Sequence, residues 1–132
     1  MNDSVPDPKR TALHAAAVEG GADDVHAALS SGDAIDAQDS QGNTPLFLAA
    51  VNQNLETLTA LLDAGADMEL ANLWGNTPLW AATFYSADDG ALIQALLDRG
   101  ADAHHVNKAG NSPRKLAWTI ANYDVRRFYP RG

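Results

Sequence analysis

Residues 44–67 read TPLFLAAVNQNLETLTALLDAGAD, and this stretch decides the fold of the chain. The hydroxyl of Thr44 can cap a helix N-terminus, and a proline at the first helical position suits the fixed φ angle of its ring. Leucines at helical spacing begin again at Leu55 and end before Gly65, a residue that suits the left-handed end of a helix. The stretch therefore predicts two consecutive helices followed by a turn.

The start of this pattern recurs along the chain. Three copies begin 33 residues apart and a fourth follows 35 residues later: Thr11-Ala12-Leu13, Thr44-Pro45-Leu46, Thr77-Pro78-Leu79 and Ser112-Pro113. Two other landmarks recur in phase with it, namely Gly32, Gly65 and Gly100 after the second helix, and the pairs Gly42-Asn43, Gly75-Asn76 and Gly110-Asn111. A fixed period of this length indicates stacked supersecondary units.

The period divides the chain into four units, at about residues 10–42, 43–75, 76–110 and 111–132. We expect residues 1–9 to form a polar N-terminal segment ahead of a single domain, residues 10–132. Each unit should contain a helix, a short loop, a second helix and a turn-rich connection. The last unit is short and carries Arg114 and Lys115 where the inner units are apolar, which suits a terminal cap with a polar outer face.

The repeated pattern Thr-Pro-Leu-x-x-Ala-Ala, followed by Leu-Leu-x-x-Gly-Ala-Asp, resembles the ankyrin repeat family over roughly residues 10–121. This resemblance implies an all-α solenoid of about four helix-loop-helix units with projecting β-hairpin-like loops. The histidine that the family places after Thr-Pro-Leu is present as His14, but Phe47, Trp80 and Lys115 replace it in the later units. We therefore expect aromatic packing to substitute there for the histidine that usually bridges neighbouring units.

Unit three departs from the pattern by two extra residues between its helices, in the segment 86–90. Asp88 and Asp89 in this segment would suit a helix N-terminus. Recurring aspartates, namely Asp33, Asp39, Asp67 and Asp102, are expected by the family resemblance to brace the hairpins; the alternative is that they form an acidic binding row. Acids outside that scheme are free to serve solubility or a partner; they are Glu19, Asp36, Glu56, Glu69, Asp88 and Asp89.

The net charge of −8 is unevenly distributed. Residues 11–98 contain thirteen acids and no Lys or Arg, whereas residues 99–132 contain seven bases and two acids. Such a field repels nucleic acid over most of the surface and favours a basic protein partner. The alternative reading is that the charge serves only solubility.

Several functions find no support in the residues. The chain has no cysteine, no segment resembling a signal peptide and no apolar run of membrane-spanning length, so we expect a cytoplasmic monomer without membrane contact. The adjacent pair His104-His105 lacks a third ligand at a metal-binding spacing. Neither a catalytic triad nor a phosphate-binding glycine loop occurs, so we expect no enzyme activity, no cofactor and no metal.

By resemblance, binding should use the hairpin tips and the exposed edge of each first helix, which together form a concave face. The candidate partner-binding residues are Ser40, Gln41, Asn43, Asn52, Leu73, Trp74, Asn76, Phe84, Tyr85, Lys108 and Asn111. Trp74, Phe84 and Tyr85 are the expected anchors, because aromatic residues dominate interface energetics. Alternatively, Trp74 folds over the neighbouring hairpin and Phe84 packs under the inserted loop. Trp80 and Trp118 are assigned to the core or to packing between units.

The function expected from these features is a non-catalytic protein-interaction module that sequesters or inhibits its partner. The alanine-rich, lysine-poor composition suggests a bacterial source. One alternative is therefore an immunity protein that neutralises a co-encoded toxin. A second is a scaffold or accessory subunit of a larger complex.

Overall fold

The computed structural model describes residues 7–86, 90–119 and 125–129. Within these ranges the chain forms helices only, and no strand. They are α1 (Ala12–Glu19), α2 (Ala22–Ser30), α3 (Pro45–Val51), α4 (Leu55–Asp63), α5 (Pro78–Phe84), α6 (Ala91–Asp98), α7 (Pro113–Thr119) and the 3-10 helix η1 (Val125–Phe128). The expected all-α repeat solenoid is confirmed. None of the described helices is long and apolar enough to cross a membrane.

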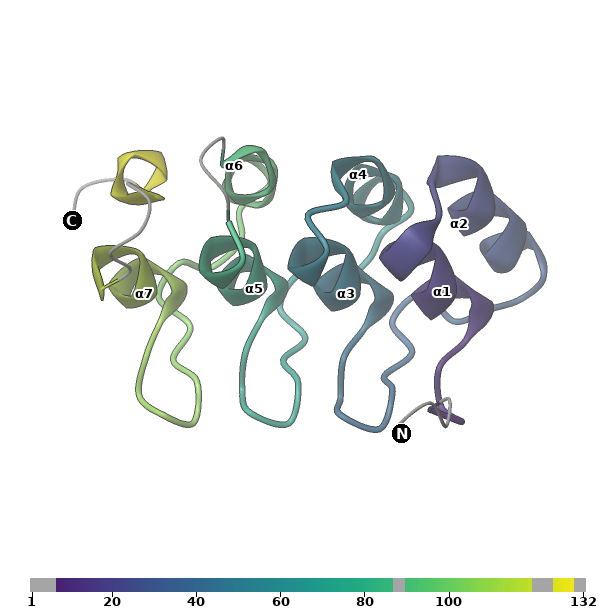
Figure 1. Cartoon of the computed structure of the whole chain (residues 1–132), viewed down its shortest axis with the longest axis horizontal. Helices are drawn as coiled ribbons and strands as arrows, with labels where there is room; N and C mark the ends of the chain where they lie inside the picture. Colours follow the sequence, from purple (N-terminus) through teal and green to yellow (C-terminus); the bar gives the residue numbers. More distant parts are fainter. Residues whose placement is uncertain (1–6, 87–89, 120–124, 130–132) are drawn as a thin grey trace.

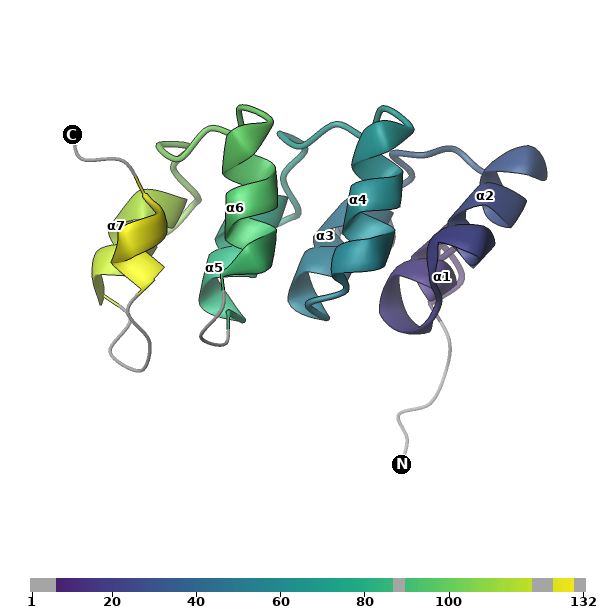
Figure 2. The same ribbon diagram turned by 90° about the horizontal axis from the view of Figure 1, so that it is seen from above.

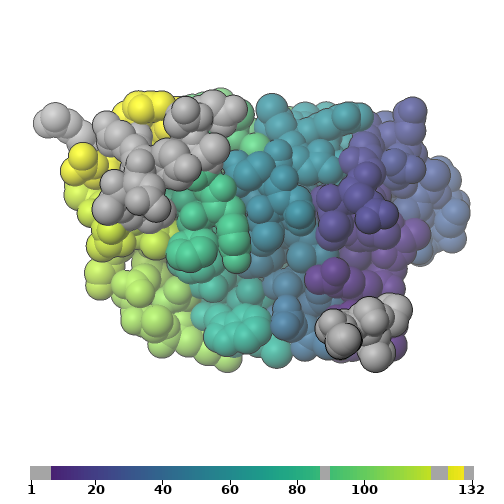
Figure 3. Space-filling model, viewed as in Figure 1, coloured from purple at the N-terminus to yellow at the C-terminus, as the bar shows by residue number. Residues whose placement is uncertain are grey.

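The helices stack in two rows (Figure 1). The first row consists of α1, α3, α5 and α7, each in contact with the next, and the second row of α2, α4 and α6 with η1 at its end. The loop after each second-row α-helix projects beyond the first row as a hairpin (Figure 1). Seen from above, the helix pairs lie side by side (Figure 2), and in the space-filling view they form one elongated, continuous surface (Figure 3).

The first-row helices begin where the sequence predicts. The hydroxyls of Thr11, Thr44 and Thr77 accept hydrogen bonds from the backbone N–H groups of His14, Phe47 and Trp80. Pro45 and Pro78 occupy the first turn of their helices. Each such cap contributes about 1 kcal/mol to helix stability.

The second-row α-helices end at the glycines that mark the period. Gly32, Gly65 and Gly100 have φ angles of 98°, 98° and 93°, as expected for left-handed helix ends. The core lies between the rows. One leucine of each of α1, α3 and α5 and the apolar faces of α4 and α6 are fully buried there: Leu13, Leu46, Leu79, Leu58, Leu61, Ile93 and Leu96. Small residues such as Ala49 and Ala82 let neighbouring helices approach closely.

Three of the acids predicted to be free instead join neighbouring units, so that prediction is wrong for them. The carboxylate of Glu56 on α4 accepts a hydrogen bond from the N–H of Ala22 at the start of α2, at 2.9 Å. Asp36 and Glu69 occupy equivalent repeat positions and accept the N–H groups of Asp67 and Asp102 at 3.0 and 2.9 Å. Asp88 and Asp89 lie outside the described residues.

The C-terminal unit closes the stack differently from the inner units. Val125 and Tyr129 are buried, and the hydroxyl of Tyr129 is hydrogen-bonded to the hydroxyl of Thr83 on α5. Burial raises the pKa of the Tyr129 phenol well above its usual range, because the charged form would lose its hydration. The assignment of Trp118 to the core is wrong: it is 43% exposed, and the Arg114 guanidinium lies 4.3 Å from its ring centroid.

Candidate protein-binding surface

Each hairpin is closed by an Asp or Asn side chain at the same repeat position: Asp39, Asn72 and Asn107. In the second hairpin, the Asn72 side-chain oxygen accepts hydrogen bonds from the N–H groups of Trp74 and Asn76, at 3.0 and 3.1 Å. Such bonds from an Asn side chain to the backbone two and four residues later fix the shape of the turn. Asn72 thus fixes the backbone of the tip that carries Trp74.

Neighbouring hairpins are also bonded to each other. Lys108 donates its backbone N–H to the Trp74 carbonyl at 3.0 Å, and Leu73 donates to the Gln41 carbonyl at 3.0 Å. The side chain of Asn107 donates to that of Asn76 at 2.7 Å, as that of Asn72 does to Asn43 at 3.0 Å. The hairpin tips therefore form a continuous shelf beside the first-row helices.

The aromatic side chains of α5 form a stacked group beside this shelf. Trp80 and Phe84, one helical turn apart, stack with ring centroids 4.9 Å apart, and Tyr85 meets Phe84 edge-on at 5.0 Å. Trp74, Phe84 and Tyr85 expose 53%, 50% and 46% of their surface. The expected exposure of these three side chains, which we call the aromatic edge, is confirmed. The alternative for Phe84 involves the inserted loop, of which residues 87–89 lie outside the described residues.

The hairpins and the first-row helices meet at an angle (Figure 1), and we call the surface on this side the concave face. Two hollows lie on it. The first, of about 600 Å³, lies between units three and four and is lined by Trp74, Asn76, Trp80, Phe84, Asn107, Lys108, Ala109, Asn111 and Leu116. The second, of about 330 Å³, lies between units two and three and is lined by Arg10, Gln41, Asn43, Phe47, Leu48, Val51, Asn72, Trp74, Asn76, Trp80 and Tyr85. Trp74, Asn76 and Trp80 line both hollows.

The predicted site residues divide into those that line these hollows and those that do not. Gln41, Asn43, Trp74, Asn76, Phe84, Tyr85, Lys108 and Asn111 line one or both. Ser40, Asn52 and Leu73 are exposed but line neither. The hydroxyl of Ser40 is already bonded to the Asp7 carboxylate at 2.7 Å.

Asn43 needs a correction as a contact residue. It is buried, its side-chain oxygen accepts from Asn72, and its carbonyl accepts from the His14 ring at 2.9 Å. Although Asn43 lines the smaller hollow, its side chain is engaged with the next hairpin through Asn72, and its carbonyl with unit one through His14.

Sequence reasoning missed several apolar lining residues, among them Trp80 and Leu116. Trp80 was assigned to packing, and it does pack against the core, but its outer part lines both hollows. Leu116 belongs to the unit assigned as a cap. A usable signal was present in each case, because Trp80 is one helical turn before Phe84 and Leu116 occupies the repeat position of Leu48.

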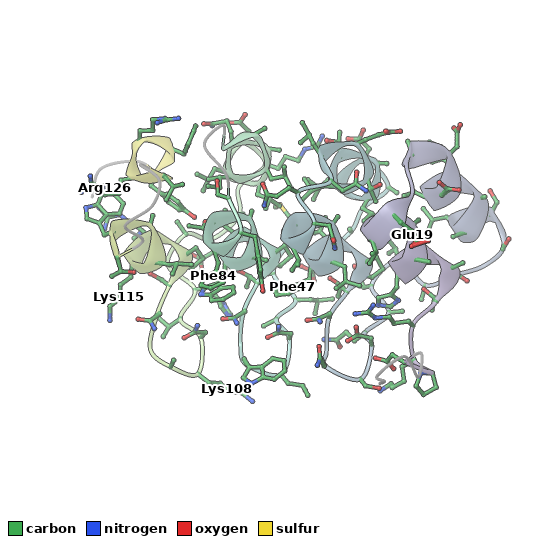
Figure 4. All side chains as sticks on the ribbon, viewed as in Figure 1. Glu19, Phe47, Phe84, Lys108, Lys115 and Arg126 are labelled. Carbon is green, nitrogen blue, oxygen red and sulfur yellow. The ribbon has the colours of Figure 1, made fainter. Side chains whose placement is uncertain are left out.

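Most acids of the described residues lie on the second-row α-helices and the loops after them, although Arg99 and Lys108 lie there as well. Besides Asp39, these acids are Asp23, Asp24, Asp33, Asp36, Glu56, Asp63, Asp67, Glu69, Asp98 and Asp102. No described acid lines either hollow. Asp39 pairs with Arg10, a lining residue of the smaller hollow, at 3.1 Å, but the side chain of Asp39 is itself buried. Figure 4 shows Phe84, Lys108 and Lys115 on the hairpin side, with Glu19 at the opposite end of the first row.

Comparisons with known proteins agree with this architecture. Residues 1–72 match the family model for ankyrin repeats in three copies, and residues 74–108 match that for a single ankyrin repeat. No curated protein matches the chain. Ankyrin repeats generally mediate protein–protein interaction and are typically non-catalytic. The periodic helix pairs, the bonded hairpins and both matches together establish that this chain belongs to the ankyrin repeat family.

Proposed function

We propose that this chain binds a partner protein at its concave face and acts by occupying that partner, as a sequestering or inhibiting protein. The observation that carries the proposal is the aromatic edge, because Trp74, Phe84 and Tyr85 each leave about half of their surface exposed beside two hollows. Clustered exposed apolar surface marks interaction sites, and aromatic anchors contribute most to binding.

The test is the double substitution Trp74→Ala and Tyr85→Ala. We expect binding of the partner, isolated by pull-down from the source organism, to weaken by more than about tenfold, with thermal unfolding nearly unchanged. Leu55→Ala is a suitable control, because Leu55 is an exposed apolar residue on α4, outside both hollows. Unchanged affinity in the double variant would remove the aromatic edge from the proposal.

Within this proposal we favour an inhibitor that works as a monomer in the cytoplasm of a bacterium. An immunity protein is one alternative form of this role. Its physical motive is the acidic second row, since many toxins that act on nucleic acid are basic. A single pulled-down partner whose activity disappears on binding supports this role. Several unrelated components would favour a scaffold instead.

The basic partner suggested by the net charge enters the proposal through long-range attraction. Most described acids lie on the second-row α-helices and the loops after them, and none of them lines either hollow. Their field would speed the approach of a basic partner without contributing contacts inside the concave face.

A further inference from the structure

We infer that the segment of the partner that enters the larger hollow is acidic as well as apolar: a large aliphatic or aromatic side chain flanked by Asp or Glu. This inference rests on the proposed function and adds the chemistry of the bound segment. It also departs from the net charge of the chain, which by itself favours a basic partner.

The apolar part of the inference follows from the walls of the hollow between units three and four. Trp74 lines it from a hairpin, Trp80 and Phe84 from α5, and Leu116 from α7. Its volume of about 600 Å³ lies within the range of sites that enclose ligand groups. Large apolar side chains are the groups that gain most from leaving water in such a place.

The acidic part follows from the charged residues around the same hollow. Lys108 is the one charged residue among those that line it, and its backbone is held beside Trp74 by the hydrogen bond at 3.0 Å. In the described part of the chain, no carboxylate pairs with Lys108 or with Lys115, which is exposed next to Leu116. Both ammonium groups are therefore available to a carboxylate of the partner.

For a segment bound in the hollow, nearby charges matter more than the net charge of the chain. At physiological ionic strength, charges more than about 8 Å apart are largely screened from each other. A bound segment therefore responds to Lys108 at the rim more than to acids on the second row. The three asparagines of the lining are neutral and leave this preference unchanged.

The smaller hollow does not share this preference. Its cation, Arg10, already pairs with Asp39, whose side chain is fully buried. The charge of that pair is cancelled within the protein, so a carboxylate placed there would gain little. The selectivity for an acidic segment is thus assigned to the hollow between units three and four.

The test uses three twelve-residue peptides that share a Leu-Phe-Leu centre and differ in their flanks, which consist of Asp and Glu, of Asn and Gln, or of Lys. Titrations are made at physiological ionic strength and followed by the NMR signals of the indole N–H groups. We expect the acidic peptide to bind about tenfold tighter than the lysine peptide and to shift the signals of Trp74 and Trp80 more than that of Trp118.

Charge reversal supplies the matched variants. Lys108→Glu should weaken binding of the acidic peptide by at least about fivefold. Arg99→Glu changes the net charge equally but lies after α6, where Arg99 pairs with Asp63 at 2.8 Å, and should leave binding within about twofold.

Several results would overturn the inference. These are equal affinity for the three peptides, tighter binding of the lysine peptide, equal effects of the two charge reversals, or no binding of the acidic peptide below a Kd of about 1 mM. In each of these cases the proposed function still stands if Trp74→Ala with Tyr85→Ala releases the partner protein. Retention of the partner by that double variant overturns the proposed function instead.

Discussion

His14 is fully buried and connects the first two units through both of its ring nitrogens. Nε2 lies 2.9 Å from the Asn43 carbonyl oxygen, and Nδ1 lies 3.0 Å from the backbone N–H of Thr11. Because a carbonyl can only accept, Nε2 carries the proton and Nδ1 accepts. Phe47 and Trp80 cannot form this bridge. Asparagine side chains make a different link, between neighbouring hairpins, in the bonds of Asn72 with Asn43 and of Asn107 with Asn76.

A second residue-scale feature is Gly90, which has a φ angle of 61° and lies against the ring of Phe128. A Cβ atom at this position would be 2.2 Å from the ring, so Gly90→Ala must displace Phe128 and loosen η1 against α6. We expect the free energy of unfolding, measured by urea denaturation, to fall by about 2–3 kcal/mol.

Gly110→Ala is the matched control for that substitution. Gly110 also has a positive φ angle, 83°, but a Cβ atom there would meet nothing within 4 Å. Gly110→Ala should therefore lower the free energy of unfolding only by the backbone strain, about 1 kcal/mol. Equal losses in the two variants would mean that contact with Phe128 contributes nothing.

At the scale of elements, the segment before α1 takes the place of a preceding hairpin. Arg10 pairs with Asp39, and these two residues stand 33 positions before the bonded pair Asn43 and Asn72. The Asp7 carboxylate accepts the N–H and the hydroxyl of Ser40, at 2.9 and 2.7 Å. The sequence pattern predicted only a separate polar segment, because it contains no copy of the hairpin motif there.

These hydrogen bonds predict an acid-sensitive contribution to stability. Bonds from the Ser40 hydroxyl and from the N–H groups of Lys9 and Ser40 lower the pKa of Asp7 to about 2. Because this value lies below that of an unfolded aspartate, about 4, the contribution is complete above about pH 4 and is lost as the pH falls towards 2. The difference in Tm between the native chain and Asp7→Asn should therefore shrink over that interval.

Asp23→Asn serves as the control for the pH dependence, since Asp23 is exposed on α2 and no hydrogen bond joins its side chain to the described residues. The difference in Tm between the native chain and Asp23→Asn should change less between pH 4 and pH 2 than the difference for Asp7→Asn. A difference in Tm between the native chain and Asp7→Asn that stays constant from pH 6 to pH 2 would contradict the proposed role of the Asp7 carboxylate.

At the scale of the whole molecule, the acids form an extended field along the second row and its loops. If the partner is basic, this field accelerates its approach, and added salt weakens the effect. Stopped-flow mixing with the isolated partner should show an association rate that falls by about three- to tenfold between low and physiological ionic strength. A flat rate would remove long-range attraction from the proposed function.

Prediction from sequence succeeded where the contacts that determine the local structure join residues close together in the sequence. Thr44 caps the N–H of Phe47 three residues later, and Asp39 braces its hairpin by accepting the N–H groups of Gln41 and Asn43. It failed for Glu56, which caps α2 from 34 residues away, and for Asp36, which bonds to Asp67. No local pattern distinguishes these acids from exposed ones.

The sequence by itself determined the helices, their order and their period, because caps, prolines and helix-ending glycines act within one turn. Only the tertiary structure decided which apolar residues reach the surface. Ala50, Thr83 and Trp118 share one repeat position, yet the first two are buried by the units that follow, whereas Trp118 is exposed in the last first-row helix. Burial depends on neighbours about 33 residues away, so the shape and charge of the concave face emerge only when the units stack.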